Sequence, residues 1–209
     1  MKSKFAVAIF VFLAIFAMTS FAQDYPKFEV PVGFSFTNVH PDLAKITSFN
    51  IFGGGGGFVY NVTPLIGIKA DFMGYTQGSG IKNKLTDAGY QIIGNVQGNV
   101  FTYMFGPQFK KHGGKFQPFG EALFGAAHSN GYASIIDTVT GIHSVQGNNN
   151  AFAMEFGGGI DIPLTKTIQI RPAEVDYLYT NFGSNHVNYV GKQNNFKYVA
   201  GVNFVFGGK

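Results

Sequence analysis

Hydrophobic and polar residues alternate along three long stretches of this chain. From Phe28 to Phe36, every second residue is Phe or Val, and the residues between them are Glu, Pro, Gly and Ser. The stretches Phe152–Ile162 and Phe196–Phe206 follow the same pattern. Successive side chains of a β-strand point to opposite faces, so a period of two predicts strands with one apolar face. Each stretch is close to the ~10 residues with which a tilted strand crosses a bilayer.

Weaker runs complete the prediction of an all-β protein. Gly and β-branched residues are frequent in them and helical periodicity is absent, which argues against helices. The last of these runs changes phase near Pro172, where we expect a β-bulge, because Pro lacks the N–H group that a strand ladder needs. The eight expected strands are Phe28–Phe36, Ser48–Asn61, Leu65–Gly74, Asn99–Phe109, Lys115–Ala127, Phe152–Ile162, Thr167–Thr180 and Phe196–Phe206.

The connections between these strands alternate in length without exception. The long ones are Thr37–Ile46, Tyr75–Gln97, His128–Asn150 and Asn181–Asn195, and the short ones are Val62–Pro64, Lys110–Gly114 and Pro163–Lys166. Transmembrane β-barrels have short turns at the periplasmic end and longer loops at the extracellular end. Soluble sandwiches and soluble barrels do not require this alternation, so it favours an eight-stranded antiparallel up-and-down barrel that spans a membrane.

The first residues have the three parts of a secretory signal peptide. Two lysines precede an apolar run from Phe5 to Met18, and small residues at positions 20 and 22 suit a signal-peptidase site. The apolar run is too short for a membrane-spanning helix, which needs about 20 residues. We therefore expect residues 1–22 to be cleaved after export and residues 23–209 to form a single barrel domain.

Composition agrees with a membrane protein built from strands. Charged residues make up 12% of the chain, about half the usual globular share, while aromatic residues reach 16%. The chain contains 29 Gly and no Cys, so core packing or a closed sheet must replace disulfides. Large aromatic residues share one face of each strand, and Gly, Ala, Ser and charged residues share the other. We expect the aromatic faces to contact lipid and the small and polar residues to fill the lumen.

Four segments carry a family resemblance. They are Phe119–Gly125, Phe156–Ile160, Ile170–Tyr179 and Gly201–Phe206. These segments resemble the eight-stranded outer-membrane β-barrels of the OmpA/OmpX type, and the resemblance covers essentially the whole mature chain. It implies a location in the bacterial outer membrane, contact with outer-membrane lipid, and assembly by the export and barrel-insertion machinery. Gly201, Phe204 and Phe206 look like the C-terminal insertion signal of such barrels, although the chain continues to Lys209 instead of ending on an aromatic residue.

Charged residues lie on the inward face of most of the expected strands. An unpaired charge inside a narrow barrel is costly, so these side chains must pair with one another. We expect Arg171 to pair with Glu121 or Glu174 in a network that fills the lumen. The alternative is a gated ion path, which the small interior of an eight-stranded barrel disfavours. The candidate lumen charges are Glu29, Lys69, Asp71, Glu121, Glu155, Asp161, Arg171, Glu174, Asp176 and Lys197.

We expect no catalytic, cofactor-binding or metal-binding residues. His128 with Ser129, and His143 with Ser144, come nearest to a hydrolase site, but neighbouring residues on a strand point to opposite faces. The histidines lack ligand spacing on any single element. The run Gly53–Gly57 lacks the Lys-Ser/Thr ending of a phosphate-binding loop.

These observations favour an integral outer-membrane barrel with a structural or surface-interaction role and a lumen plugged by polar side chains. Three alternatives remain: a small pore for ions or small solutes, an outer-membrane enzyme that modifies lipid, and a soluble ligand-binding barrel. The long loops are rich in Asn, Gly and Ser and form the expected surface for an extracellular partner. The slightly positive charge of the mature chain does not indicate nucleic-acid binding.

Overall fold

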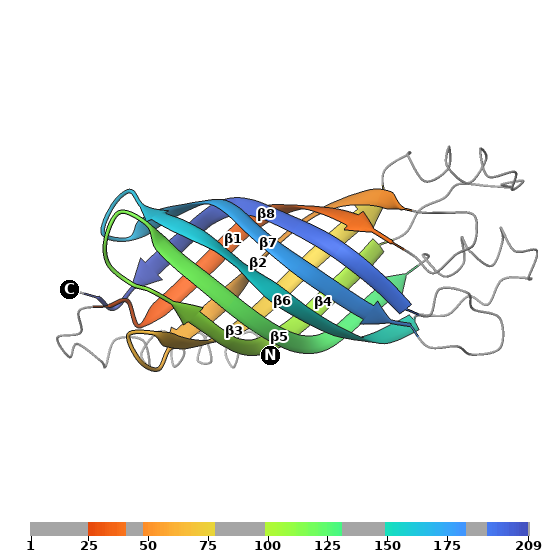
Figure 1. Cartoon of the computed structure of the whole chain (residues 1–209), viewed down its shortest axis with the longest axis horizontal. Coiled ribbons are helices and arrows are strands. Elements are labelled where there is room, and N and C mark those ends of the chain that lie inside the picture. Colours follow the sequence, from red (N-terminus) through yellow and green to blue (C-terminus); the bar gives the residue numbers. More distant parts are fainter. Residues whose placement is uncertain (1–24, 41–47, 78–98, 131–148, 183–191, 209) are drawn as a thin grey trace, which may run out of the picture.

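The computed structural model of the chain is a closed antiparallel barrel (Figure 1). It describes residues 25–40, 48–77, 99–130, 149–182 and 192–208. Eight strands follow one another around the barrel in chain order, which confirms the predicted fold. They are β1 (Phe28–Val39), β2 (Phe49–Asn61), β3 (Ile66–Gln77), β4 (Asn99–Lys110), β5 (Gln117–Asn130), β6 (Asn149–Pro163), β7 (Ile168–Asn181) and β8 (Lys192–Phe206). Within these described ranges, no helix is long and apolar enough to cross a membrane.

The seam between β1 and β8 closes the sheet. Phe28 lies opposite Phe206 at one end of this seam, and Asn38 lies opposite Phe196 at the other. A closed sheet has no open edge, so its backbone N–H and C=O groups find partners within the barrel. This pairing is the condition under which strands can cross the hydrocarbon part of a bilayer.

The aromatic faces of the strands point outward. Phe101, Phe156 and Phe204 are 39%, 40% and 37% exposed, and Phe34 and Phe105 both reach 60%. The residues that alternate with them point into the lumen and are largely buried. The expected orientation, with apolar side chains toward lipid and polar side chains inward, is therefore confirmed.

β7 contains the bulge expected at Pro172. Its register with β8 shifts between Arg171 and Glu174. The hydroxyl of Tyr198 donates a hydrogen bond to the carbonyl oxygen of Pro172 at 2.6 Å. The extra residue changes the phase of the strand, so that Arg171 and Glu174 both point into the lumen although they are three positions apart.

Three short turns lie at one end of the barrel, on the left in Figure 1, where the described chain also begins and ends. They are residues 62–65, 111–116 and 164–167. Thr63 Oγ1 accepts a hydrogen bond from the N–H of Ile66 at 2.9 Å, and Thr165 Oγ1 accepts one from the N–H of Ile168 at 3.0 Å. These local bonds stabilise tight turns between neighbouring strands. We name this end the turn end and the opposite end the loop end.

Most strands are longer than the alternation predicted. β1 continues to Val39, β6 begins at Asn149, β8 begins at Lys192, and β4 includes Lys110. The extensions at the loop end are rich in Asn, Gln and Thr on both faces, so hydrophobic alternation does not report where these strands end. The expected signal peptide and most of the long connections lie outside the described residues.

Candidate functional site

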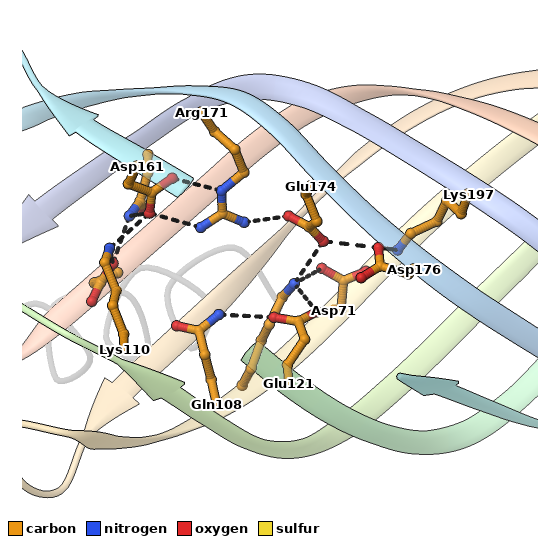
Figure 2. Close-up of polar contacts among 12 residues, drawn as sticks. Asp71, Gln108, Lys110, Glu121, Asp161, Arg171, Glu174, Asp176 and Lys197 are labelled. Carbon is orange, nitrogen blue, oxygen red and sulfur yellow. Dashed lines mark hydrogen bonds and ion pairs between the residues drawn. The ribbon is translucent and has the colours of Figure 1, made fainter. Parts of the chain in front are cut away.

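All ten candidate lumen charges are buried in the barrel interior. Their exposed fractions run from 0% for Glu29 to 6% for Glu121. Lys110, which the sequence pattern assigned to a short connection, joins them with an exposed fraction of 1%. Figure 2 shows the contacts that several of these side chains make with one another across the lumen. The buried carboxylates are Glu29, Asp71, Glu121, Glu155, Asp161, Glu174 and Asp176, and the buried basic side chains are Lys69, Lys110, Arg171 and Lys197.

Arg171 of β7 joins two carboxylates. Its Nε donates to Asp161 Oδ1 at 2.8 Å and its Nη2 donates to Asp161 Oδ2 at 2.9 Å, which makes a bidentate pair. Its Nη1 donates to Glu174 Oε2 at 2.6 Å, and its guanidinium lies 4.1 Å from the centre of the Phe119 ring. The expected pair with Glu174 therefore forms, whereas Glu121, the other expected partner, contacts Lys69 instead.

Lys110 at the end of β4 organises the part of the network nearest to the turn end. Its Nζ donates to Glu29 Oε2 at 2.5 Å, to Asp161 Oδ2 at 2.7 Å and to Gln169 Oε1 at 2.9 Å. Glu29 also accepts hydrogen bonds from two asparagines, and His112 Nε2 lies 2.9 Å from its Oε1. Every charge in this part of the network therefore has several polar partners, as burial requires.

Lys69 of β3 holds two carboxylates near the middle of the barrel. Its Nζ lies 2.8 Å from Glu121 Oε1 and 3.2 Å from Asp71 Oδ1. The side-chain amide of Gln108 donates to the second oxygen of Glu121 at 2.9 Å. The side chain of Glu121 is thus held from two strands other than its own.

Lys197 of β8 holds the carboxylates that lie farthest from the turn end. Its Nζ lies 2.5 Å from Glu155 Oε1 and 3.1 Å from Asp176 Oδ2. Glu174 lies between the two central lysines, 3.5 Å from the Nζ of Lys69 and 4.0 Å from that of Lys197. Because Glu174 also binds the arginine, the ion pairs of the described residues form one connected network.

Acidic side chains outnumber basic ones in this network. Seven acidic side chains face three lysines and one arginine in the part of the lumen that the structure describes. Asp176 is fully buried, yet neither of its carboxylate oxygens accepts a hydrogen bond from a described residue. Its contact with the ammonium of Lys197 is an ion pair without hydrogen-bond geometry. Asp176 is therefore less well satisfied than Glu29 or Asp161.

Four buried carboxylates are close enough to one another to hold a metal ion, with oxygens within 4.8 Å: Glu121, Glu155, Glu174 and Asp176. Carboxylate oxygens are ligands for hard cations such as Mg²⁺ or Ca²⁺. The ammonium groups of Lys69 and Lys197 already lie against this group and provide its positive charge. The arrangement is therefore accounted for by lysine–carboxylate pairing, and the expected absence of a metal site stays a prediction.

Some interior polar residues were not among the sequence candidates. Lys110 follows Gln108 by two positions, so extending the alternation of the fourth run by one residue would have placed it on the inward face. Gln108, Gln169 and Asn203 are buried at 0%, 3% and 0% exposed, and they bind the charged side chains. A pattern of charges alone does not identify these amides, although they share the same inward face.

An apolar cluster occupies part of the lumen toward the loop end, beside buried Thr, Gln and Asn side chains, and this cluster differs from the small and polar filling that we expected throughout. Leu123 is fully buried and belongs to a cluster with Met104, Leu178 and three alanines of β5 and β6. The inward face of β5 changes from Glu121 to Leu123 within two positions. The sequence pattern assigned one character to each whole strand face, and this change within a face was therefore missed.

His128 and Ser129 do not form a nucleophile–base pair. The Nδ1 atom of His128 lies 2.8 Å from Asn150 Oδ1 on the outer face of the barrel. Ser129 is 1% exposed and points inward. The two side chains therefore lie on opposite faces of β5, as strand geometry requires. The second pair, His143 with Ser144, lies outside the described residues.

The residues of the expected insertion signal lie on β8 beside β1. Gly201 lies opposite Gly33, and a Cβ atom at Gly201 would overlap the carbonyl oxygen of Val32. Phe204 and Phe206 point outward and are 37% and 49% exposed. The glycine allows close approach of the two strands at the seam, and the phenylalanines belong to the apolar outer surface. Recognition of these residues during insertion stays a prediction.

A closed eight-stranded barrel with an aromatic outer face and an ion-paired interior defines a transmembrane β-barrel of the bacterial outer membrane. The chain belongs to the outer membrane protein beta-barrel domain family, which it matches over residues 8–204. It is therefore an outer-membrane protein.

The chain is similar to solved structures of outer-membrane proteins. Neisserial surface protein A aligns with a TM-score of 0.61 and 12% identity, and the alignment covers 86% of this chain and 97% of that protein. Ail of Yersinia pestis, solved in complex with the heparin analogue sucrose octasulfate, aligns with a TM-score of 0.48 and 15% identity over 86% of this chain and 99% of Ail. No curated protein sequence matches the chain significantly. The similarity to Neisserial surface protein A concerns the fold alone.

Proposed function

We propose that this protein is an integral outer-membrane barrel whose lumen is closed to solutes, with a structural role or a role in surface interaction. The observation that carries the proposal is the connected ion-pair network. It extends from Glu29 on β1 through the lumen to Lys197 on β8. Most of these charges have partners on other strands, so the network would also hold the strands in their closed arrangement.

Two small cavities among the described residues agree with a filled lumen over that part of the barrel. One lies beside Lys69 and Arg171 and has a volume of about 20 Å³. The other lies toward the loop end beside Ile51, Tyr75 and Leu178 and is also about 20 Å³. A cavity of this size holds about one water molecule. The interior of an eight-stranded barrel is narrow enough for side chains to fill it, which agrees with these small volumes.

The proposal includes no catalytic activity. The opposite orientations of His128 and Ser129 support this, because a nucleophile must lie within reach of its base. Recognition would instead depend on the long connections at the loop end, since loops on a rigid scaffold commonly carry binding sites. Outer-membrane lipid is the partner of the apolar outer surface, and an extracellular partner of the loops remains part of the proposal.

Conductance in planar lipid bilayers tests the closed lumen. The purified barrel should give no stable single-channel steps above the bare membrane. A shift in gel mobility between unheated and boiled samples shows that the inserted protein is a folded, detergent-resistant barrel. Stable steps from protein that passes this control would contradict the proposal.

A small cation pore is the second candidate function. The lumen contains seven buried acidic side chains and four basic ones, and acidic side chains line the pores of cation channels. In that case the same bilayers would show steps with a reversal potential shifted toward cations in a salt gradient. The variant Asp176→Asn would then reduce the cation selectivity, since Asp176 is one of the surplus carboxylates.

We also propose that residues 1–22 are removed on export and that the insertion machinery recognises Gly201, Phe204 and Phe206. Protein recovered from outer membranes should begin at Gln23 in N-terminal sequencing, and a start at Met1 would contradict cleavage. The variant Phe206→Ser should lower the amount that reaches the outer membrane but still refold in detergent. Equal loss in both assays would indicate a defect in barrel stability instead.

A further inference from the structure

Exposed charges at the turn end all have the same sign. Lys111, Lys115 and Lys166 are exposed in two of the short turns, and Lys27 is half-buried just before β1. Every acidic side chain that the structure describes is buried in the lumen. Among the described residues, none of these four lysines forms an ion pair with a carboxylate. The turn end is therefore a ring of positive charge without exposed acidic residues from the described chain.

The same turns also expose large apolar side chains. Val62 and Leu65 of the first turn are 47% and 55% exposed, Phe116 of the second is 57% exposed, and Leu164 of the third is 59% exposed. In a turn surrounded by water, these exposed apolar side chains would not contribute to stability, because burial of apolar surface is what is favourable. Apolar and basic side chains occur together where a protein meets the interface between hydrocarbon and headgroups.

The positions of two lysines agree with such an interface. Lys27 Nζ lies 4.7 Å from the centre of the Tyr60 ring, and Lys115 Nζ lies 5.8 Å from the centre of the Phe116 ring. The aliphatic stems can follow the apolar surface while the ammonium groups reach toward the headgroup layer. An ammonium group in that layer is complementary to a lipid phosphate.

We propose that Lys27, Lys111, Lys115 and Lys166 form a basic collar that binds the headgroups of anionic phospholipids around the turn end. The partner is a phospholipid surface with net negative charge, such as phosphatidylglycerol. The proposal rests on the proposed function only in placing the turns at the periplasmic leaflet. Binding itself is measurable in symmetric membranes, whether or not the lumen conducts.

Spin-labelled lipids test the collar. The barrel is reconstituted in phosphatidylcholine vesicles that contain trace spin-labelled phosphatidylglycerol or phosphatidylcholine, and electron spin resonance gives the fraction of each label that is immobilised by the protein. The wild-type protein should immobilise phosphatidylglycerol preferentially. Replacing Lys111, Lys115 and Lys166 together by Gln should lower this preference roughly twofold. Each lysine near an anionic lipid surface strengthens binding roughly fivefold, but the measured preference is an average over all the lipids around the barrel.

The matched control is Lys192→Gln, which removes an exposed charge at the loop end. This variant should keep the preference, and added salt should weaken the preference of the wild-type protein by screening. Gel mobility before and after boiling confirms that each variant is folded. The proposal is overturned if wild-type protein shows no preference, if the triple variant retains it in full, or if Lys192→Gln lowers it as much. A conducting lumen would contradict the proposed function and leave this result unaffected.

Discussion

The lumen of this barrel has a charged half toward the turn end and an opposite half in which an apolar cluster lies beside buried Thr, Ser, Gln and Asn side chains. Toward the turn end, seven carboxylates and four basic side chains form a connected network of ion pairs. Toward the loop end, Met104, Leu123 and Leu178 pack with three alanines. The same strands contribute to both halves, since the inward face of β5 passes directly from Glu121 to Leu123.

The two halves differ in what holds them together. A buried charge depends on each of its partners, and removing one partner leaves the others unpaired in a low-dielectric interior. An apolar cluster depends mainly on the volume that its side chains fill. We therefore expect the charged half to be sensitive to the loss of a charge that serves several partners, and the apolar half to tolerate changes that preserve volume.

The largest expected effect is that of Arg171→Ala in the charged half. Asp161 would lose its two hydrogen bonds from the guanidinium, and Glu174 would lose one. The free energy of unfolding should fall by about 4 kcal/mol, as is typical when one partner of a buried ion pair is removed. Urea unfolding in lipid vesicles measures the loss. Arg171→Lys should lose less, because it keeps the charge but not the fork geometry.

This prediction also separates a plug from a gate. If Arg171→Ala kept wild-type stability and raised single-channel conductance, the network would be acting as a gate. A loss of stability without any conductance would support a network that holds a closed barrel together.

Leu123→Ala should have the next largest effect, in the apolar half. The leucine is fully buried among Met104 and Leu178, so its truncation leaves a cavity that costs about 3 kcal/mol. Leu123→Met is the matched control, and it should cost less than about 1.5 kcal/mol because volume is preserved. The same unfolding assay applies to both. If the methionine variant were as unstable as the alanine variant, shape rather than volume would control this half.

The fold could be predicted from the sequence because lipid and lumen impose opposite demands on alternate residues. Aromatic residues such as Phe34 and Phe156 lie on the outer face of their strands, and the phase change at Pro172 marks the bulge. Strand ends were less predictable, since the extensions at the loop end carry polar residues on both faces. The alternation of long and short connections gave the strand order around the barrel.

The pairing within the lumen could not be predicted in the same way. Arg171 contacts Asp161 because their neighbouring strands are held in a particular register, and that register shifts between Ile160 and Ile162. Alternation reports which face a residue occupies but not which residues meet across the lumen. The apolar half could not be predicted for a related reason, since Leu123 and Leu178 share their strand faces with Glu121 and Asp176.

Gly157→Ala should have a smaller effect and tests how tightly the charged half is packed. A Cβ atom at Gly157 would overlap the carboxylate of Asp176 and the carbonyl oxygen of Val175. The resulting strain should lower the free energy of unfolding by about 2 kcal/mol. Gly120→Ala is the matched control, because a Cβ atom at Gly120 meets its nearest neighbour, the carbonyl oxygen of Gly157, at an ordinary 3.6 Å. Equal stability of the two variants would show that the strands move apart at little cost.

Asp176→Asn should have the smallest effect, although it also changes a buried charge. Asp176 accepts no hydrogen bond from a described residue, and Lys197 retains its contacts with Glu155 and Glu174. The free energy of unfolding should therefore change by less than about 1 kcal/mol, which is the typical net value of one hydrogen bond. A loss as large as that of Arg171→Ala would mean that each surplus carboxylate is required. A small change would show that the charged half depends on its basic side chains, each of which serves more than one carboxylate.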